Sequence, residues 1–372
     1  MHRVPFLLES PDTTLHPSII IMAELRLAIA SVSLGRSAAG HGLIHKIQQA
    51  ALHSFQGVEI FYECLEHLAC SLPGGLSEKN LLAAAEKTRA ACDSHGITVV
   101  CLQPFGSAEG LLDAEAREDM FQRLRLWIKI SHALGCDLIQ VPTNFLPGKC
   151  TTGDFETICA DLREISQIGM EASPRVRLAY EAVSWGTHID IWEGAWEVVK
   201  AVNMPNLGLC LDTFHITGRV WGDPTSKSGK NVEADRALDV SLSRMVNELH
   251  ADKIFYIQSG DAQKLEPPLS EQHPWHDPGQ RPRMTWSRNG RLFAYEEDEG
   301  AYLPVESVLD AIINGLGYRG WVSLEAFSRE LACEDSAIPA LYAQRGLRSW
   351  QRMRESLGIA DSAATGLSRA HL

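Results

Sequence analysis

The fold is decided by four apolar segments in the second half of the chain, RLAYEAV (177–183), LGLCLDTFH (207–215), KIFYIQS (253–259) and WVSLEAF (321–327). Each is rich in β-branched or bulky residues, and most are nearly continuous hydrophobic runs. Strands of a parallel sheet have this composition because helices bury both of their faces. Four earlier segments have the same character: RLAIAS (26–31), GVEIFY (57–62), ITVVCLQ (97–103) and DLIQVP (137–142).

The segments between these runs have helical periodicity. Examples are LLAAAEKTRAACDSH (81–95), EAREDMFQRLRLWIKISHAL (115–134) and FETICADLREISQIGM (155–170). A strand followed by a helix therefore recurs along the chain. This alternation predicts an α/β fold, and its eight repeats favour a closed (β/α)8 TIM barrel over a doubly wound sheet.

We expect a single catalytic barrel domain, residues 25–357, without a linker. Residues 1–24 are expected to be a disordered N-terminal extension, since Met22 reads like a natural start that enters a strand within a few residues. The polar tail, residues 358–372, is expected to be disordered as well. A long loop after the seventh strand (260–303) is expected to be functional and to cover the barrel mouth.

Composition excludes several classes of partner. The formal net charge is -13 and the basic residues are scattered, which disfavours nucleic-acid binding. No apolar run reaches the roughly 18 residues of a membrane span, so we expect no membrane partner. The nine cysteines form no CxxC pair, which argues against a disulfide framework and predicts a reducing, cytoplasmic location. A homo-oligomer is left open.

Oxygen-donor side chains end four consecutive strands of the expected barrel: Glu181, Asp212, Gln258 and Glu325. Barrel enzymes carry their chemistry at these strand ends. Three carboxylates buried together need a cation, and hard oxygen donors favour Mg²⁺ or Mn²⁺, with Co²⁺ as a substitute. The alternative is that the acids pair with lysines or arginines inside the barrel, but none stands at a comparable strand end.

His215 follows Asp212 by three residues at the same barrel mouth. This position suits a general base or acid, and the alternative is a structural histidine. Ser287, Arg288 and Arg291 lie in the long connection before the last strand, where arginine forks match a carboxylate or phosphate of a substrate, unless they are solvated surface charges. Further residues near strand ends could line the pocket: Gln103, His188 and Glu63.

At these residues the chain resembles the fungal 3-dehydroshikimate dehydratases of the xylose-isomerase-like barrel superfamily. The resemblance covers about residues 25–355. The motifs that carry it include GVEIFYECL (57–65), CLQPFGSAEGLLD (101–113), YEAVSWGTHID (180–190), CLDTFHITGR (210–219), FYIQSGDA (255–262), WSRNGRLF (286–293) and GWVSLEAF (320–327).

The resemblance implies a divalent metal held by the four strand-end residues and a carboxylated ring substrate that loses water to give protocatechuate. It implies that His215 removes a proton next to the substrate ketone, and Glu181 is expected to take part in catalysis as well as in metal binding. It further implies that Ser287 and Arg291 contact the substrate carboxylate. Bacterial relatives have an arginine where this chain has Gly106, so one substrate contact is missing or comes from elsewhere.

Three rival functions share this barrel. A sugar or keto-acid isomerase or epimerase would use the same metal to stabilise an enediolate, but the arginine-bearing loop and Gln258 favour a carboxylated ring substrate. An apurinic-site endonuclease would need more histidine ligands and a basic face. A non-catalytic paralogue is disfavoured because all four expected ligands are retained.

Overall fold

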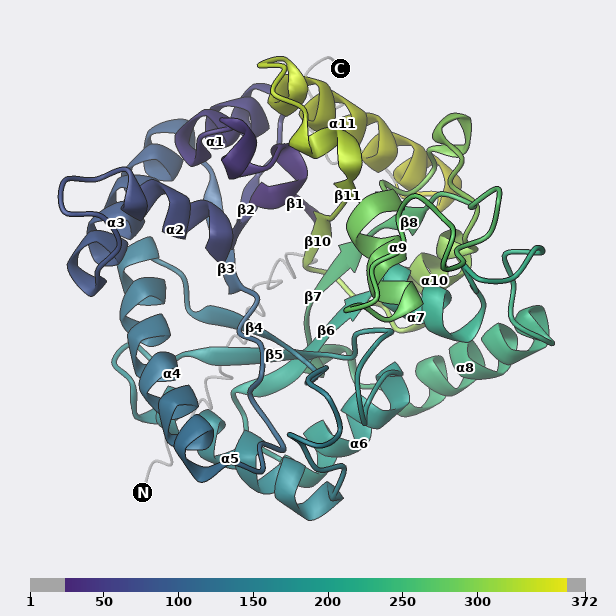
Figure 1. Ribbon diagram of the computed structural model, residues 1–372, viewed down its shortest axis with the longest axis horizontal. Helices are drawn as coiled ribbons and strands as arrows, with labels where there is room; N and C mark the ends of the chain where they lie inside the picture. Colours follow the sequence, from purple (N-terminus) through teal and green to yellow (C-terminus); the bar gives the residue numbers. More distant parts are fainter. Residues whose placement is uncertain (1–23, 360–372) are drawn as a thin grey trace, which may run out of the picture.

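A computed structural model of the chain describes residues 24–359. Eight parallel strands form a closed barrel in the spatial order β1-β10-β7-β6-β5-β4-β3-β2 (Figure 1). The predicted (β/α)8 barrel is therefore confirmed, and each barrel strand falls within one predicted apolar segment. The strands are β1 (Arg26–Ala30), β2 (Gly57–Phe61), β3 (Thr98–Gln103), β4 (Leu138–Pro142), β5 (Arg177–Glu181), β6 (Leu207–Asp212), β7 (Ile254–Ser259) and β10 (Trp321–Leu324).

The expected extension and tail lie almost entirely outside the described residues. Within residues 24–359, none of the helices is long and apolar enough to cross a membrane. The domain boundaries stay a prediction.

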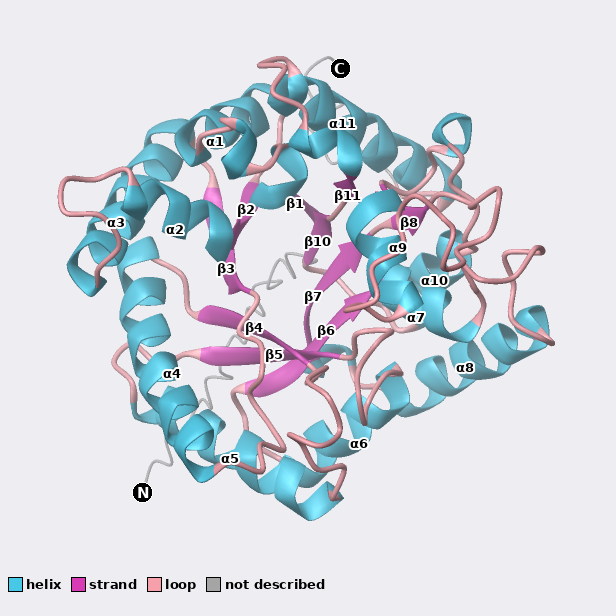
Figure 2. Ribbon diagram, viewed as in Figure 1, coloured by secondary structure: helices cyan, strands magenta, loops and turns pink. Residues whose placement is uncertain are grey.

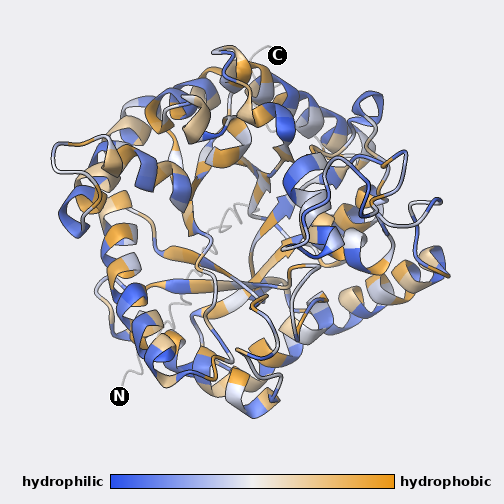
Figure 3. Cartoon of the chain, in the orientation of Figure 1, coloured by the Kyte–Doolittle hydropathy of each residue, from blue (hydrophilic) through white to orange (hydrophobic). Residues whose placement is uncertain are grey.

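Helices surround the barrel on its outside (Figure 2). They are α1 (Leu43–Leu52), α2 (Tyr62–Cys70), α3 (Glu78–His95), α4 (Ala114–Leu134), α5 (Phe155–Glu171), α6 (Trp192–Val202), α7 (Thr213–Val220), α8 (Ala234–Glu248), α9 (Pro282–Gly290), α10 (Val305–Asp310) and α11 (Ile338–Ser356). Most are amphipathic: hydrophobic residues recur along each helix among hydrophilic ones (Figure 3). Barrel strands and inner helix faces thus form one continuous core.

Local signals explain where the outer helices begin and end. The side chains of Ser77 and Asp113 accept hydrogen bonds from the first turns of α3 and α4. Both helices end at a glycine in the left-handed conformation, Gly96 with φ 66° and Gly135 with φ 76°. Capping side chains and left-handed glycines are the usual signals for helix ends, so sequence reasoning placed these helices to within a few residues.

The sixth predicted strand is shorter than expected, because the chain turns helical directly after Asp212. The Oδ1 atom of Asp212 accepts hydrogen bonds from the backbone N–H groups of Phe214, at 2.7 Å, and His215, at 3.3 Å. An aspartate in this arrangement caps a helix N-terminus. His215 therefore lies in the first turn of α7 and not on the strand.

The long connection between β7 and β10 has more structure than the sequence suggested. The segment expected to be irregular contains α9, which begins at a proline, and the short strand β9 (Arg291–Leu292). β9 pairs antiparallel with β8 (Asp261–Ala262) and β11 (Phe327–Ser328) in a small sheet beside the barrel (Figure 1). This sheet fixes the position of α9 and β9, which carry three of the predicted substrate-binding residues, Ser287, Arg288 and Arg291.

Candidate active site

The four predicted strand-end residues lie at the same end of the barrel and are all buried. Strand register explains this, since Asp212 is the pairing partner of Gln258 on the neighbouring strand. The exposed fraction is 4% for Glu181, 2% for Asp212, 0% for Gln258 and 4% for Glu325. Ligand atoms of Glu181, Asp212 and His215 lie within 4.8 Å of one another. Glu181 and Asp212 thus lie together at the carboxyl ends of their strands, with His215 beside them.

A buried arginine enters this cluster from β9. Its Nη2 atom donates to Oδ2 of Asp212, and its Nη1 atom lies 3.0 Å from Oε2 of Glu325. Gly260 makes room for it, because a Cβ there would lie 2.8 Å from the Nε atom of this residue, Arg291. The alternative that the acids pair with an arginine therefore holds for Asp212 and Glu325, although Arg291 comes from a loop and not from a strand end.

One arginine does not balance the buried acids. Burial raises the pKa of Glu181 well above its usual range, and the charges of Asp212 and Glu325 raise it further. Burial also raises the pKa of Glu325, while Arg291 lowers it. A fourth carboxyl, Glu59 on β2, is fully buried in the same interior, and burial raises its pKa too. The acid cluster is short of positive charge, so its oxygen donors fit a divalent cation.

His215 is buried between the acids and two aromatic side chains. Its Nε2 atom lies 4.0 Å from Oε1 of Glu181 and 3.9 Å from Oδ2 of Asp212. Burial lowers the pKa of His215 to about 3; Asp212 opposes this shift and Arg291 adds to it. The ring is therefore neutral at pH 7 and can accept a proton.

Ser184 contacts Nδ1 of this histidine with both its backbone N–H and its hydroxyl. Its backbone N–H donates to Nδ1 of His215 at 3.1 Å, which leaves the proton on Nε2. The Oγ atom of Ser184 lies 3.3 Å from the same Nδ1 and can accept from it in the other tautomer. In that second tautomer Nε2 is a free base directed toward the acids.

A cavity of about 130 Å³ opens above the acid cluster. Seven of the predicted site residues line it: Gln103, Glu181, His215, Ser287, Arg288, Arg291 and Glu325. Asp212 and Gln258 lie deeper. Apolar side chains form much of the remaining wall: Phe61, Pro104, Pro142, Phe145, Val183, Trp185 and Phe327. A small cavity with an apolar wall and a charged floor suits a small polar ring.

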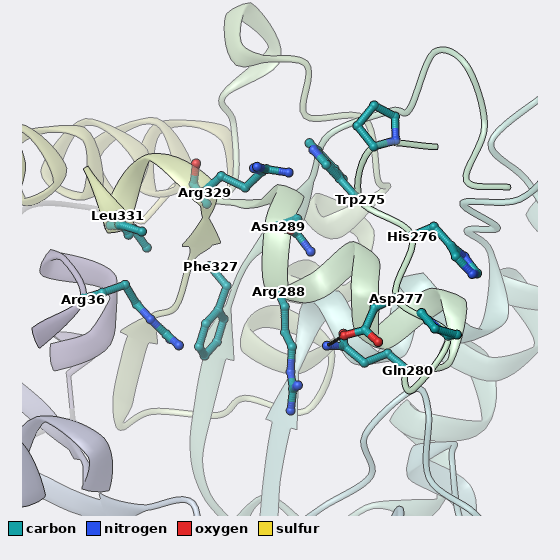
Figure 4. Close-up of a pocket in the computed structure, with 14 residues that line it drawn as sticks. Arg36, Trp275, His276, Asp277, Gln280, Arg288, Asn289, Phe327, Arg329 and Leu331 are labelled. Atoms are coloured by element: carbon teal, nitrogen blue, oxygen red, sulfur yellow. Dashed lines mark hydrogen bonds between the residues drawn. The ribbon is translucent and has the colours of Figure 1, made fainter. Parts of the chain in front are cut away.

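A wider cavity of about 590 Å³ adjoins the first and shares Arg288 and Phe327 with it. We call it the vestibule. Figure 4 shows Arg36 and Arg288 on either side of the Phe327 ring. Burial lowers the pKa of Arg288, and the neighbouring charge of Arg36 lowers it further. Among the described residues no ion pair or hydrogen bond engages its guanidinium, so Arg288 is available to an anion.

Two residues expected near the pocket lie elsewhere. His188 contacts Thr151, with its Nε2 atom 3.0 Å from the hydroxyl, and does not line either cavity. Glu63 lies on α2 and pairs with Arg36 at 3.2 Å. Gly106 stands where bacterial relatives have an arginine. Its carbonyl accepts a hydrogen bond from Arg123 on α4, outside the cavity.

Two polar residues of the site escaped the sequence reasoning. Gln140 on β4 donates to Oε2 of Glu181 and lines the cavity. Glu59 accepts from Gln258 and Gln103 in the barrel interior. Both interrupt apolar strand segments, DLIQVP and GVEIFY, and this is the signal that identified Glu181. Each lies two residues before the end of its strand, so the strand-end pattern does not single it out.

Comparison with known proteins agrees with the barrel fold. Residues 47–353 match the family described as a xylose isomerase-like TIM barrel. A 3-dehydroshikimate dehydratase of Neurospora crassa is 43% identical over 340 residues, which are 90% of this chain and 95% of that protein. A 3-dehydroshikimate dehydratase of Pseudomonas putida is 29% identical over 82% of this chain, which spans 38% of that protein.

A solved structure shares the barrel. It is a xylose isomerase-like TIM barrel/4-hydroxyphenylpyruvate dioxygenase fusion protein, and it aligns with 90% of this chain and 43% of its own length at 26% identity and a TM-score of 0.68. The family match over most of the chain and the identity to the Neurospora protein agree with the barrel fold. The chain belongs to the xylose isomerase-like TIM barrel family, in the group that contains the Neurospora 3-dehydroshikimate dehydratase.

Proposed function

We propose that this chain is a 3-dehydroshikimate dehydratase, a hydro-lyase that removes water from 3-dehydroshikimate to give protocatechuate. The observation that carries the proposal is the cluster of Glu181, Asp212 and His215 beneath a small cavity, where Arg288 has no ion-pair partner among residues 24–359. The 43% identity to the Neurospora dehydratase over nearly its whole length supports the same substrate.

The residues that would hold a divalent cation are Glu181, Asp212, Gln258 and Glu325. A cation bound there would act as a Lewis acid that stabilises negative charge on the substrate ketone oxygen during proton removal. Mg²⁺ or Mn²⁺ is proposed because all four side chains offer oxygen, and Co²⁺ is expected to substitute.

His215 is proposed to remove the proton next to the ketone. Its ring is neutral, and it acts as the base in the tautomer whose Nδ1–H donates to Oγ of Ser184 in place of the contact with the backbone N–H. Glu181 lies 4.0 Å from that nitrogen, where its charge would stabilise the imidazolium formed. The C–O bond of the β-hydroxyl then breaks, and the hydroxyl leaves as water with one added proton. Tautomerisation gives the aromatic ring.

Ser287 and Arg288 are proposed to hold the substrate carboxylate. The resemblance alone assigns this role to Ser287 and Arg291, but the guanidinium of Arg291 lies between Asp212 and Glu325. Arg288 is the other arginine that lines the cavity above the acid cluster. It would supply the positive charge that an arginine supplies in bacterial relatives at the position of Gly106. A bidentate arginine–carboxylate pair also orients a planar ring.

The experiment that tests the proposal is incubation of the purified full-length protein with 3-dehydroshikimate, with and without added Mn²⁺. Protocatechuate is followed by its ultraviolet absorbance and identified by mass spectrometry. We expect product formation that a chelator stops and Mn²⁺ restores. Absence of protocatechuate under every metal condition would contradict the proposed function, and full turnover in exhaustively chelated protein would contradict the metal requirement.

A cytoplasmic location is part of the proposal. All nine cysteines are free thiols, and six of them are buried: Cys64, Cys92, Cys101, Cys136, Cys159 and Cys210. This supports a reducing compartment. No partner other than the small-molecule substrate is required, and a homo-oligomer remains a prediction.

A further inference from the structure

Glu59 lies at the centre of a hydrogen-bond network inside the barrel. It is 0% exposed. Its Oε2 atom accepts from Nε2 of Gln258 at 3.0 Å and from Nε2 of Gln103 at 3.1 Å. The thiol of Cys101 donates to the same oxygen at 3.4 Å. No lysine or arginine of residues 24–359 pairs with this carboxyl, so neutral donors alone satisfy it.

The contact with Gln258 fixes the direction of its amide. An amide has a donor end and an acceptor end, and here the donor end faces Glu59. The acceptor end must then face the other way. It does, because the thiol of Cys210 donates to Oε1 of Gln258 at 3.5 Å and also lies 3.9 Å from Oε1 of Glu181. The oxygen of Gln258 therefore lies beside Cys210, whose thiol also contacts the carboxylate of Glu181.

The second amide links Glu59 to the last strand. Nε2 of Gln103 donates to Oε2 of Glu59 and, at 2.8 Å, to Oε1 of Glu325. One buried carboxyl thus sets the orientation of Gln258 and, through Gln103, holds Glu325. Gln258 and Glu325 are two of the four residues proposed to hold the divalent cation.

We propose that Glu59 is a positioning residue that presents the oxygens of Gln258 and Glu325 to a divalent cation. It does not contact the cation or the substrate itself, since it lies below the cavity and does not line it. Outer partners of this kind hold metal ligands in place, and their loss typically weakens metal binding about 10- to 100-fold. The inference rests on the proposed function for the identity of the ligands.

The test is Mn²⁺ binding to the full chain, measured by calorimetry, for wild type and Glu59→Gln. Nε2 of Gln258 lies 3.2 Å from Oε1 and 3.0 Å from Oε2 of Glu59, so glutamine would set an amide N–H group against this donor or turn its oxygen away from Gln103. We expect the dissociation constant for Mn²⁺ to rise about 10- to 100-fold. If Glu59→Gln does not fold, Glu59→Asp takes its place, because its shorter carboxyl cannot reach both amides. Wild-type Mn²⁺ affinity in either folded variant would overturn the inference.

A second measurement separates positioning from general stability. Gln258→Glu places a carboxyl against that of Glu59 and should lower the melting temperature of the metal-free protein. Adding Glu59→Gln to it restores a donor–acceptor pair, so the double variant should recover most of that loss. Simple additivity of the two changes would show that Glu59 does not act through Gln258.

The matched control is Glu296→Gln. Glu296 is a buried carboxyl that lines neither cavity and is bound by Arg345 at 2.7 and 2.9 Å. Its loss should cost stability without changing Mn²⁺ affinity, whereas an equal loss of affinity would overturn the specific role of Glu59. Failure of the proposed function itself looks different, since the wild-type protein would then neither bind Mn²⁺ nor form protocatechuate.

Discussion

Arg288 and Arg291 are three residues apart, yet they have opposite surroundings. Burial lowers the pKa of Arg291, but Asp212 and Glu325 outweigh it and raise the pKa overall. Arg288 faces the charge of Arg36 and engages no anion among the described residues. The first arginine therefore acts within the protein, while the second is available to a substrate.

Replacing Arg288 should weaken substrate binding. A charge-assisted hydrogen bond contributes about 1.5–3 kcal/mol, so Arg288→Ala should lower kcat/KM about 10- to 100-fold. The loss should appear mainly in KM, because the carboxylate is held equally in the ground and transition states. Steady-state kinetics with 3-dehydroshikimate measure this.

Arg288→Lys is the matched control. It keeps the charge but loses the fork, so it should fall between alanine and wild type. Unchanged KM in both variants would remove Arg288 from the site and return the carboxylate contact to Arg291.

Among the elements, the small sheet β8-β9-β11 depends on one buried carboxyl. The Oδ1 atom of Asp261, which is 3% exposed, accepts from the backbone N–H groups of Ala262 at 2.6 Å, Leu303 at 2.9 Å and Tyr302 at 3.2 Å. Burial raises the pKa of Asp261 to about 7, against these hydrogen bonds. This one oxygen thus holds Ala262, which precedes α9, together with Tyr302 and Leu303, which follow β9.

Asp261 should make the stability of the protein depend on pH. Its folded-state pKa lies above the unfolded value, so the protonated form favours folding. This contribution is complete below about pH 4 and is lost as the pH rises through 7. Between pH 5 and pH 8 it should decrease the free energy of unfolding by about 2–3 kcal/mol.

Asp261→Asn keeps the acceptor and removes the titration. Urea unfolding of wild type and variant at pH 5 and pH 8 measures the difference. The pH dependence of the variant should be smaller by that amount, and identical dependence in both proteins would contradict the prediction.

The barrel strands could be predicted from the sequence because each is a short, nearly continuous hydrophobic segment. The acids could be predicted because each stands at the end of such a segment, where barrel enzymes carry their chemistry. The sequence did not predict α9, whose segment PRMTWSRNG is polar and short. It also did not predict that Arg291 pairs with Asp212, a residue 79 positions away. That contact depends on how the whole connection after β7 folds, and the residues next to Arg291 in the sequence do not predict this.

At the scale of the whole molecule, the barrel holds four buried carboxyls, Glu59, Glu181, Asp212 and Glu325, and one guanidinium beside them. The metal-free protein should therefore be less stable than the metal-bound protein. A cation at 100 times its dissociation constant stabilises the folded state by about 2.7 kcal/mol.

Thermal unfolding in a chelator and in increasing Mn²⁺ measures this difference. We expect the melting temperature to rise with Mn²⁺ concentration in wild type and to rise less in Glu181→Gln. A melting temperature that is the same at every Mn²⁺ concentration would show that the folded protein does not bind the ion at these acids.

The connection between β7 and β10 has an evolutionary consequence. The proposed metal ligands lie in barrel strands or directly after one, whereas Ser287 and Arg288 lie on α9 in the connection that begins at Gly260. Exchange of this one stretch of gene between relatives would therefore replace Ser287 and Arg288 together with Arg291, while the four proposed metal ligands stay in place. A barrel built in this way can acquire a new substrate and keep the residues proposed to bind its metal.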